Sequence, residues 1–133
     1  MSTVEIEIPS RSAYVRVVRL ALTSLARAAG LEEETVDDLK IAVSEACANA
    51  VIANEQAGSD EGVRVVWSEE DERIVVDIAD RRSGPEPASL ADSQGFDTRL
   101  VMSEALLDTL VDGMEVIPRD GGGATTRLTV SRT

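Results

Sequence analysis

The spacing of apolar residues changes soon after the start of the chain. In VEIEI, residues 4–8, apolar and polar positions alternate, and this period of two predicts a strand with one buried face. Beyond Pro9 the apolar positions recur every three or four residues, which predicts a helix from residue 10 or 12 to residue 29. Gly30 follows where a helix C-terminal cap belongs.

A second helix is predicted to begin near Thr35 and to run to about Asn54. Thr35 with Asp38 three residues later resembles a capping box in which Asp replaces the usual Glu. The acidic residues 32–34 would lie near the positive end of the helix dipole. The stretch QAGSDEG, residues 56–62, is rich in turn-forming residues and predicts a connection rather than a packed element.

The remainder of the chain predicts one more helix and four more strands. In chain order these are strands over 63–68 and 73–79, an irregular stretch over 81–97, a helix over 98–111, a strand over 114–117, the turn PRDGGG, and a last strand, ATTRLTV. The order β-α-α-β-β-α-β-β predicts an α+β two-layer sandwich with a mostly antiparallel, mixed sheet covered on one face by three helices. We expect a single domain over residues 1–133.

Composition narrows the classes of partner. The 25 acidic and 13 basic residues give a net charge of -12, which repels phosphate backbones and anionic membrane surfaces. We therefore expect no direct nucleic acid partner and no membrane partner. A small anionic ligand is compatible with this charge, because a metal ion or a helix N-terminus can reverse the local field.

The single cysteine and the N-terminal segment bear on the compartment. Cys47 cannot form an intramolecular disulfide, which favours a reducing compartment, and its place in the helix predicts a small core residue rather than a reactive thiol. MSTVEIEIPS has neither a basic stretch nor an apolar run, and no segment approaches membrane-spanning length. We expect a cytoplasmic protein.

The stretch VSEACANAV, residues 43–51, places a carboxylate and a carboxamide among small apolar residues. Glu45 and Asn49 would lie about 40° apart on a helical wheel, on a helix whose pattern predicts burial around most of its circumference. A carboxylate buried without a partner costs several kcal/mol or takes up a proton. Either the pair hydrogen-bonds a neighbouring loop, or it belongs to a functional pocket.

Three stretches at the right separations resemble the boxes of a known superfamily. SEACANAV resembles the N box of the Bergerat-type ATP-binding domains, IADRRSG their first glycine box, and GGGATTRLTV their last. Gyrase, histidine kinases and anti-sigma-factor serine kinases share this domain. Within this superfamily the chain most resembles the bacterial anti-sigma factors with serine protein kinase activity. The features that carry this resemblance are the SEA-x-x-NA motif, the chain length and the opening strand followed by SAYVR.

This resemblance implies ATP and Mg²⁺ as cofactors and gives roles to particular residues. Asn49 would bind the Mg²⁺ that bridges the ATP phosphates, and Glu45 would act as the base for phosphoryl transfer. Asp80 would accept a hydrogen bond from the adenine amino group. The glycine-box and lid contacts to nucleotide would come from Gly84, Gly95, Gly123 and Thr125.

The resemblance also implies partners. A family member binds a sigma factor as a homodimer and phosphorylates a serine on a STAS-domain anti-sigma factor antagonist, which disables that antagonist. Arg16 matches the first-helix arginine that family members use to contact the sigma factor and its competitor. An ordinary surface arginine is the alternative interpretation.

Several positions depart from the family pattern. The first glycine box reads DRRSG, so Arg82 replaces the first glycine and Gly84 alone keeps its place. The lid region SQGFDTR retains only Gly95, and Ala53 stands where many relatives have a histidine. A second hypothesis is therefore a non-catalytic partner-binding module of the same fold. A third is a structural α+β adaptor in which the matches are accidental.

Overall fold

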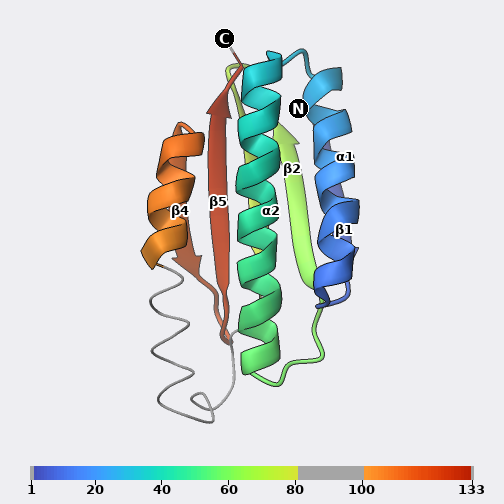
Figure 1. The fold of residues 1–133 in the computed structure, drawn as a ribbon, viewed down its shortest axis with the longest axis vertical. Helices are drawn as coiled ribbons and strands as arrows, with labels where there is room; N and C mark the ends of the chain where they lie inside the picture. The colour runs from blue at the N-terminus through green and yellow to red at the C-terminus, as the bar shows by residue number, and fades with distance from the viewer. Residues whose placement is uncertain (1, 81–100, 133) are drawn as a thin grey trace.

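The computed structural model describes residues 2–80 and 101–132, which form two layers (Figure 1). The first half of the chain contains β1 (Ser2–Ile8), a 3-10 turn (Ser12–Tyr14), α1 (Val15–Ala28) and α2 (Glu33–Gln56). The hairpin of β2 (Val63–Glu69) and β3 (Arg73–Ala79) follows. Residues 101–110, here called the third helix, precede β4 (Gly113–Pro118) and β5 (Ala124–Ser131).

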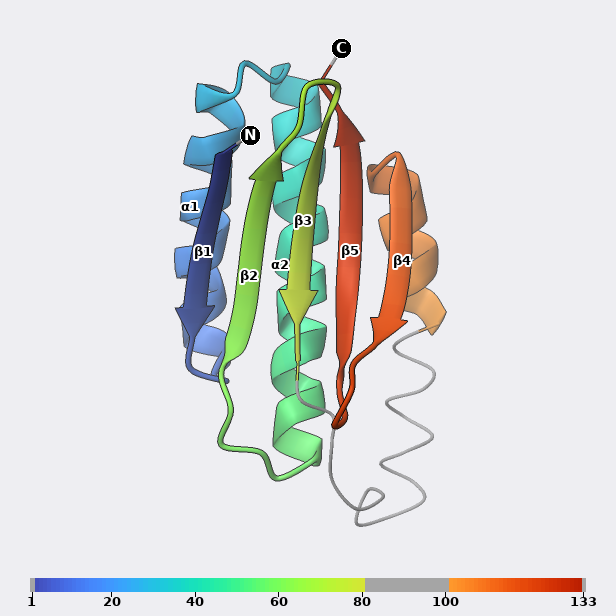
Figure 2. The ribbon, with the colours of Figure 1, turned by 180° about the vertical axis from the view of Figure 1, so that it is seen from behind.

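The five strands form one sheet in the order β1-β2-β3-β5-β4. All four ladders between these described strands are antiparallel, so the mixed pairing we expected is not found among them. The helices lie on one face of this sheet, and Figure 2 shows the opposite face without a described helix. The α+β two-layer architecture predicted from the order of elements is confirmed.

Alternation along the strands builds the core between the layers. Val63, Val65 and Trp67 of β2 are buried, as are the residues in phase with them on β3, and α1 and α2 pack over them. The opposite face is polar where β3 meets β5. There Arg127 donates to Asp77 through two nitrogens, at 2.8 and 3.0 Å, and this carboxylate raises the pKa of Arg127.

Glycine ends both long helices in the same way. Gly30 has φ +82° and its N–H bonds to the carbonyl of Arg27 at 3.0 Å, while Leu31 N–H bonds to Ala26 at 3.2 Å. This pair of bonds is a Schellman motif, and Gly58, with φ +65°, ends α2 in the same way. The predicted cap at Gly30 is confirmed.

The predicted start of α2 was wrong by two residues. Glu32 is the N-cap, in extended conformation, and neither it nor Thr35 provides a side-chain cap; Thr35 is already inside the helix. The carbonyl of Glu32 accepts the N–H of Val36 at 2.9 Å, and Glu33 and Glu34 form the acidic first turn. The helix dipole favours these carboxylates even without a hydroxyl cap. The capping-box pattern at Thr35 therefore predicted the wrong start for the helix.

None of the helices within residues 2–80 and 101–132 is long and apolar enough to cross a bilayer.

Candidate functional site

A cavity of about 20 Å³ lies between the C-terminal half of α2, the third helix and the sheet. Small residues of α2 allow this close approach, because Ala46 and Ala50 carry no side chain beyond Cβ. The residues that line the cavity come from every element around it: Ala46, Asn49, Ala50, Asp80, Ser103, Glu104, Leu107, Met114, Val116 and Thr126.

Two of the residues singled out in the sequence meet in this cavity. Asn49 reaches it from α2 and is only 6% exposed; Asp80 reaches it from the end of β3 and is 2% exposed. They are 31 positions apart in the sequence. Glu45 lies one helical turn before Asn49 and is half-buried.

The position of Asp80 is fixed by its neighbours on the sheet. Its N–H donates to the carbonyl of Ala124 at 3.0 Å, and the N–H of Ala124 donates to Asp80 Oδ1 at 3.1 Å. Arg119, in the turn between β4 and β5, donates to the Asp80 carbonyl at 2.8 Å. The carboxylate is therefore held rigidly, as a group that orients a ligand must be.

Ser103 is a cavity residue that sequence reasoning missed. Its Oγ donates a hydrogen bond to Glu45 Oε1, across 58 positions of sequence. A signal was available, because Ser103 stands four residues before the buried Leu107 and so shares its face of the third helix. A serine on the buried face of a helix needs a polar partner, and here that partner is Glu45.

Thr126, not Thr125, lines the cavity. In the β3–β5 ladder Thr126 pairs with Ile78, which is buried under the helices, whereas Thr125 pairs with Ala79. Successive side chains of a strand point to opposite faces, so Thr125 lies on the face of the sheet away from α2. Thr126 rather than Thr125 therefore faces the cavity, while the nucleotide contact expected of Thr125 stays a prediction.

The glycines expected to contact nucleotide have different outcomes. Gly123 lies in the β4–β5 turn with φ +88°, after Gly121 and Gly122, which also have positive φ. Its carbonyl accepts the N–H of Arg119 at 3.0 Å, so it shapes the turn that holds Asp80. Gly84 and Gly95 lie outside the described residues.

Arg16 and Cys47 do not line the cavity. Arg16 is exposed on α1, and Figure 1 shows α1 and the third helix on opposite sides of α2. Cys47 is fully buried, and burial raises the pKa of its thiol to about 12. The prediction that Cys47 is a core residue is confirmed.

The cavity residues suit a hard cation that arrives with its own ligands. Within residues 2–80 and 101–132 no three His, Cys, Asp or Glu side chains form a cluster that could hold a metal. A carboxamide oxygen such as that of Asn49 is a ligand that Mg²⁺ accepts, with phosphates and water as the others. The donor set thus fits a nucleotide-borne Mg²⁺, while the 20 Å³ volume is far below that of a nucleotide pocket.

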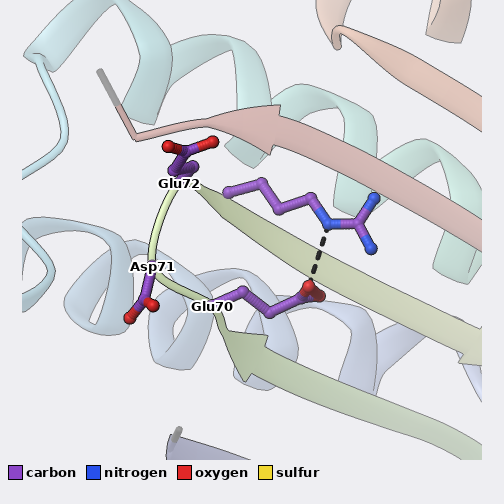
Figure 3. Close-up of a pocket in the computed structure, with 4 residues that line it drawn as sticks. Glu70, Asp71 and Glu72 are labelled. Atoms are coloured by element: carbon purple, nitrogen blue, oxygen red, sulfur yellow. Dashed lines mark hydrogen bonds and ion pairs between the residues drawn. The ribbon is translucent and has the colours of Figure 1, made fainter.

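A larger hollow, of about 580 Å³, lies at the β2–β3 hairpin and is lined by Glu70, Asp71, Glu72 and Arg73 (Figure 3). Arg73 pairs with Glu70 at 2.9 Å. Three carboxylates around an open turn repel an anionic ligand, so we do not assign the nucleotide to this hollow.

Comparison with known proteins identifies the family of the domain. The profile of the histidine kinase-like ATPase domain matches residues 8–130. The serine-protein kinase RsbW of Oceanobacillus iheyensis is 32% identical over 120 residues, covering 79% of this chain and 75% of that protein. The RsbW kinase of Bacillus pumilus is 39% identical over 80 residues, but the match covers 59% of this chain and 49% of that protein.

The fold has also been seen in a crystal structure. The RsbU and RsbW domains of a Mycobacterium tuberculosis protein superpose with a TM-score of 0.69 at 23% identity, covering 98% of this chain and 32% of that chain. The chain spans about half the length of the first curated relatives it matches.

Proposed function

Because this chain belongs to the family of histidine kinase-like ATPase domains, we propose that it binds ATP in the cavity between α2 and the third helix and transfers its γ-phosphoryl group to a serine of a protein partner. The observation that carries this proposal is the meeting of Asn49 and Asp80 in one cavity, with Glu45 one helical turn away. Family membership also removes the hypothesis of an adaptor with accidental matches.

Each side chain has a task that its surroundings support. Asp80, pinned by Ala124, would accept a hydrogen bond from the adenine amino group. Asn49 would hold Mg²⁺, which supplies positive charge to the phosphates of a protein with net charge -12. Glu45 would take the proton of the attacking serine hydroxyl, and Thr126 would contact the base from β5.

The resemblance supplies the partners of the proposed reaction. The partners would be a sigma factor, bound and sequestered by a homodimer of this chain, and a STAS-domain antagonist that carries the phosphorylated serine. Since both act on transcription, the cytoplasm is the proposed location. The outer face of α1 suits a protein partner, because Tyr14, Val17 and Leu20 are 40–58% exposed beside Arg16.

Calorimetric titration with ATP, with and without Mg²⁺, tests the cavity. We expect binding that depends on Mg²⁺ and that Asn49→Ala and Asp80→Asn each weaken by at least about tenfold, as the loss of a hydrogen bond to a charged group would. Ser44→Ala is the matched control, because Ser44 lies on the same helix outside the cavity lining and bonds to Lys40. Equal affinities of Asn49→Ala and Ser44→Ala would contradict the metal role.

Transfer of label from γ-labelled ATP to a candidate antagonist tests the reaction. Glu45→Ala should reduce the rate by about a hundredfold or more, which is the usual contribution of a general base. Glu55→Ala, an exposed glutamate of the same helix, should leave the rate unchanged. Transfer that survives Glu45→Ala would mean that another group takes the proton.

A second candidate function is a non-catalytic module that binds its partner without nucleotide. The small cavity and the occupied Glu45 carboxylate favour this candidate. It predicts that the protein shows no heat of ATP binding with Mg²⁺ yet binds its sigma factor. Loss of sigma factor binding in Arg16→Ala, with Arg27→Ala as an exposed control on the same helix, would support the α1 surface under either function.

A further inference from the structure

Ser103 carries a contact that the proposed reaction does not use. Its side chain is 4% exposed, and its hydroxyl donates to Glu45 Oε1. This bond joins the third helix to α2 at the residue proposed as the base. The hydroxyl therefore occupies the kind of position on Glu45 that the serine of a protein acceptor would need.

Within residues 101–110, two side chains are buried in the core and Leu110 is partly buried against it. The two buried residues are Ser103 and Leu107, whereas Val101 and Met102 are 69% and 70% exposed and Leu106 is 42% exposed. Leu107 gives non-directional apolar contact in the core. The Ser103–Glu45 bond is directional and involves a charged acceptor, so it fixes where the helix sits.

The cavity that Ser103 lines is small. A volume of about 20 Å³ has room for about one water molecule, and small-molecule sites measure about 300–1,000 Å³. Ser103 and Leu107 of the third helix and Asn49 of α2 line that volume from opposite sides. Among the described residues, the third helix and α2 are the elements that would have to separate for a nucleotide to reach Asn49 and Asp80 together.

We propose that Ser103 and Glu45 form a latch that holds the third helix against α2 and must open before the site can bind nucleotide and accept a partner serine. The catalytic consequence rests on the proposed function, but the latch itself can be observed without nucleotide. Opening breaks the hydrogen bond from the Ser103 hydroxyl to Glu45. The movement that admits nucleotide therefore also makes Glu45 available as the base. Ser103 is a positioning residue in this scheme.

Amide hydrogen exchange in the full chain, without nucleotide, tests the latch. Ser103→Ala should speed exchange in residues 101–110 by about tenfold or more, since a hydrogen bond to a charged group is lost. Glu45→Ala should also speed exchange in residues 101–110, because it removes the acceptor of the same hydrogen bond. Ser103→Thr keeps a hydroxyl and should remain close to the wild type, as should Thr109→Ala, whose hydroxyl bonds only within the third helix to Leu106.

Two results would overturn the latch. One is equal exchange in Ser103→Ala and Thr109→Ala. The other is an equal rise over β2 and β3, which would mean that Ser103 supports the whole fold rather than one helix.

Titration with Mg²⁺-ATP separates the latch from the proposed function. A latch lowers apparent affinity by the fraction of open molecules, so Ser103→Ala should bind about tenfold more tightly than the wild type. Equal affinity would overturn the coupling while leaving ATP binding established. No binding by either protein, together with faster exchange in Ser103→Ala, would refute the proposed function and leave the latch standing.

Discussion

At the scale of the residue, Cys47 illustrates how burial controls chemistry. Its thiol lies in the core beneath α2, and desolvation of the thiolate raises its pKa from 9.0 to about 12. The folded protein therefore keeps the thiol protonated at pH values where the unfolded chain releases that proton.

This difference makes a pH prediction with a definite sign. Between pH 9 and pH 12 the unfolded state binds fewer protons, so the Cys47 contribution to stability is complete below pH 9 and is lost as the pH rises, by about 1.4 kcal/mol per pH unit at most. Denaturant unfolding at pH 8 and pH 10.5 should show a larger loss for the wild type than for Cys47→Ala. Parallel losses in the two proteins would contradict the prediction.

Trp67 gives a second test at this scale. It is fully buried, and its indole Nε1–H has no hydrogen-bond acceptor within the described parts of the chain. Trp67→Phe removes an unsatisfied donor that costs about 1–3 kcal/mol, which offsets the lost packing. We expect a change within about 1 kcal/mol, against about 3–5 kcal/mol for Trp67→Ala, measured by chemical unfolding followed by circular dichroism.

The cavity residues differ in how far their sequence context reveals them. Glu45 and Asn49 could be placed on one helix face because both lie in one periodic segment. Thr126 could have been chosen over Thr125, because it is in phase with the buried Leu128 and Val130. Ser103 could be assigned to a buried face, but its partner Glu45 lies on another element and could not be read from the sequence.

At the scale of the element, the helix ends follow local rules. Gly30 and Gly58 end α1 and α2 because a residue with positive φ is needed where each chain turns away. The start of α2 was harder to predict, since acidic residues from Glu32 onward and the hydroxyl of Thr35 both suit a helix N-terminus.

Gly30→Ala should destabilise the fold by about 1–2 kcal/mol, the cost of a left-handed conformation for a residue with a Cβ. Space is not the cause, because a Cβ there would meet no atom within 4 Å. Gly113→Ala is the matched control: its φ is not positive, and its Cβ would make ordinary contact with Thr129 at 3.5 Å. The thermal midpoint of Gly30→Ala should be lower than that of Gly113→Ala, and equal midpoints would contradict the prediction.

At the scale of the whole molecule, the net charge of -12 affects the stability of the fold. Self-repulsion weakens the compact state, and salt screens it over about 10 Å at 0.1 M. We therefore expect the thermal midpoint to rise between 20 mM and 300 mM NaCl, by about 4 °C for each 1 kcal/mol of repulsion relieved. A fall would mean that attractive pairs such as Arg127–Asp77 outweigh the repulsion.

The elements and the two-layer architecture could be predicted from the sequence alone, because strand alternation, helical period and glycine caps are local properties that each segment carries. The sequence also placed Glu45 and Asn49 on one helix face. The residues that surround this pair depend on how distant segments pack together. The antiparallel register of β3 with β5 brought Asp80 and Thr126 to the cavity, and packing of the third helix brought Ser103 to Glu45. Both depend on contacts between distant segments, which no local pattern encodes.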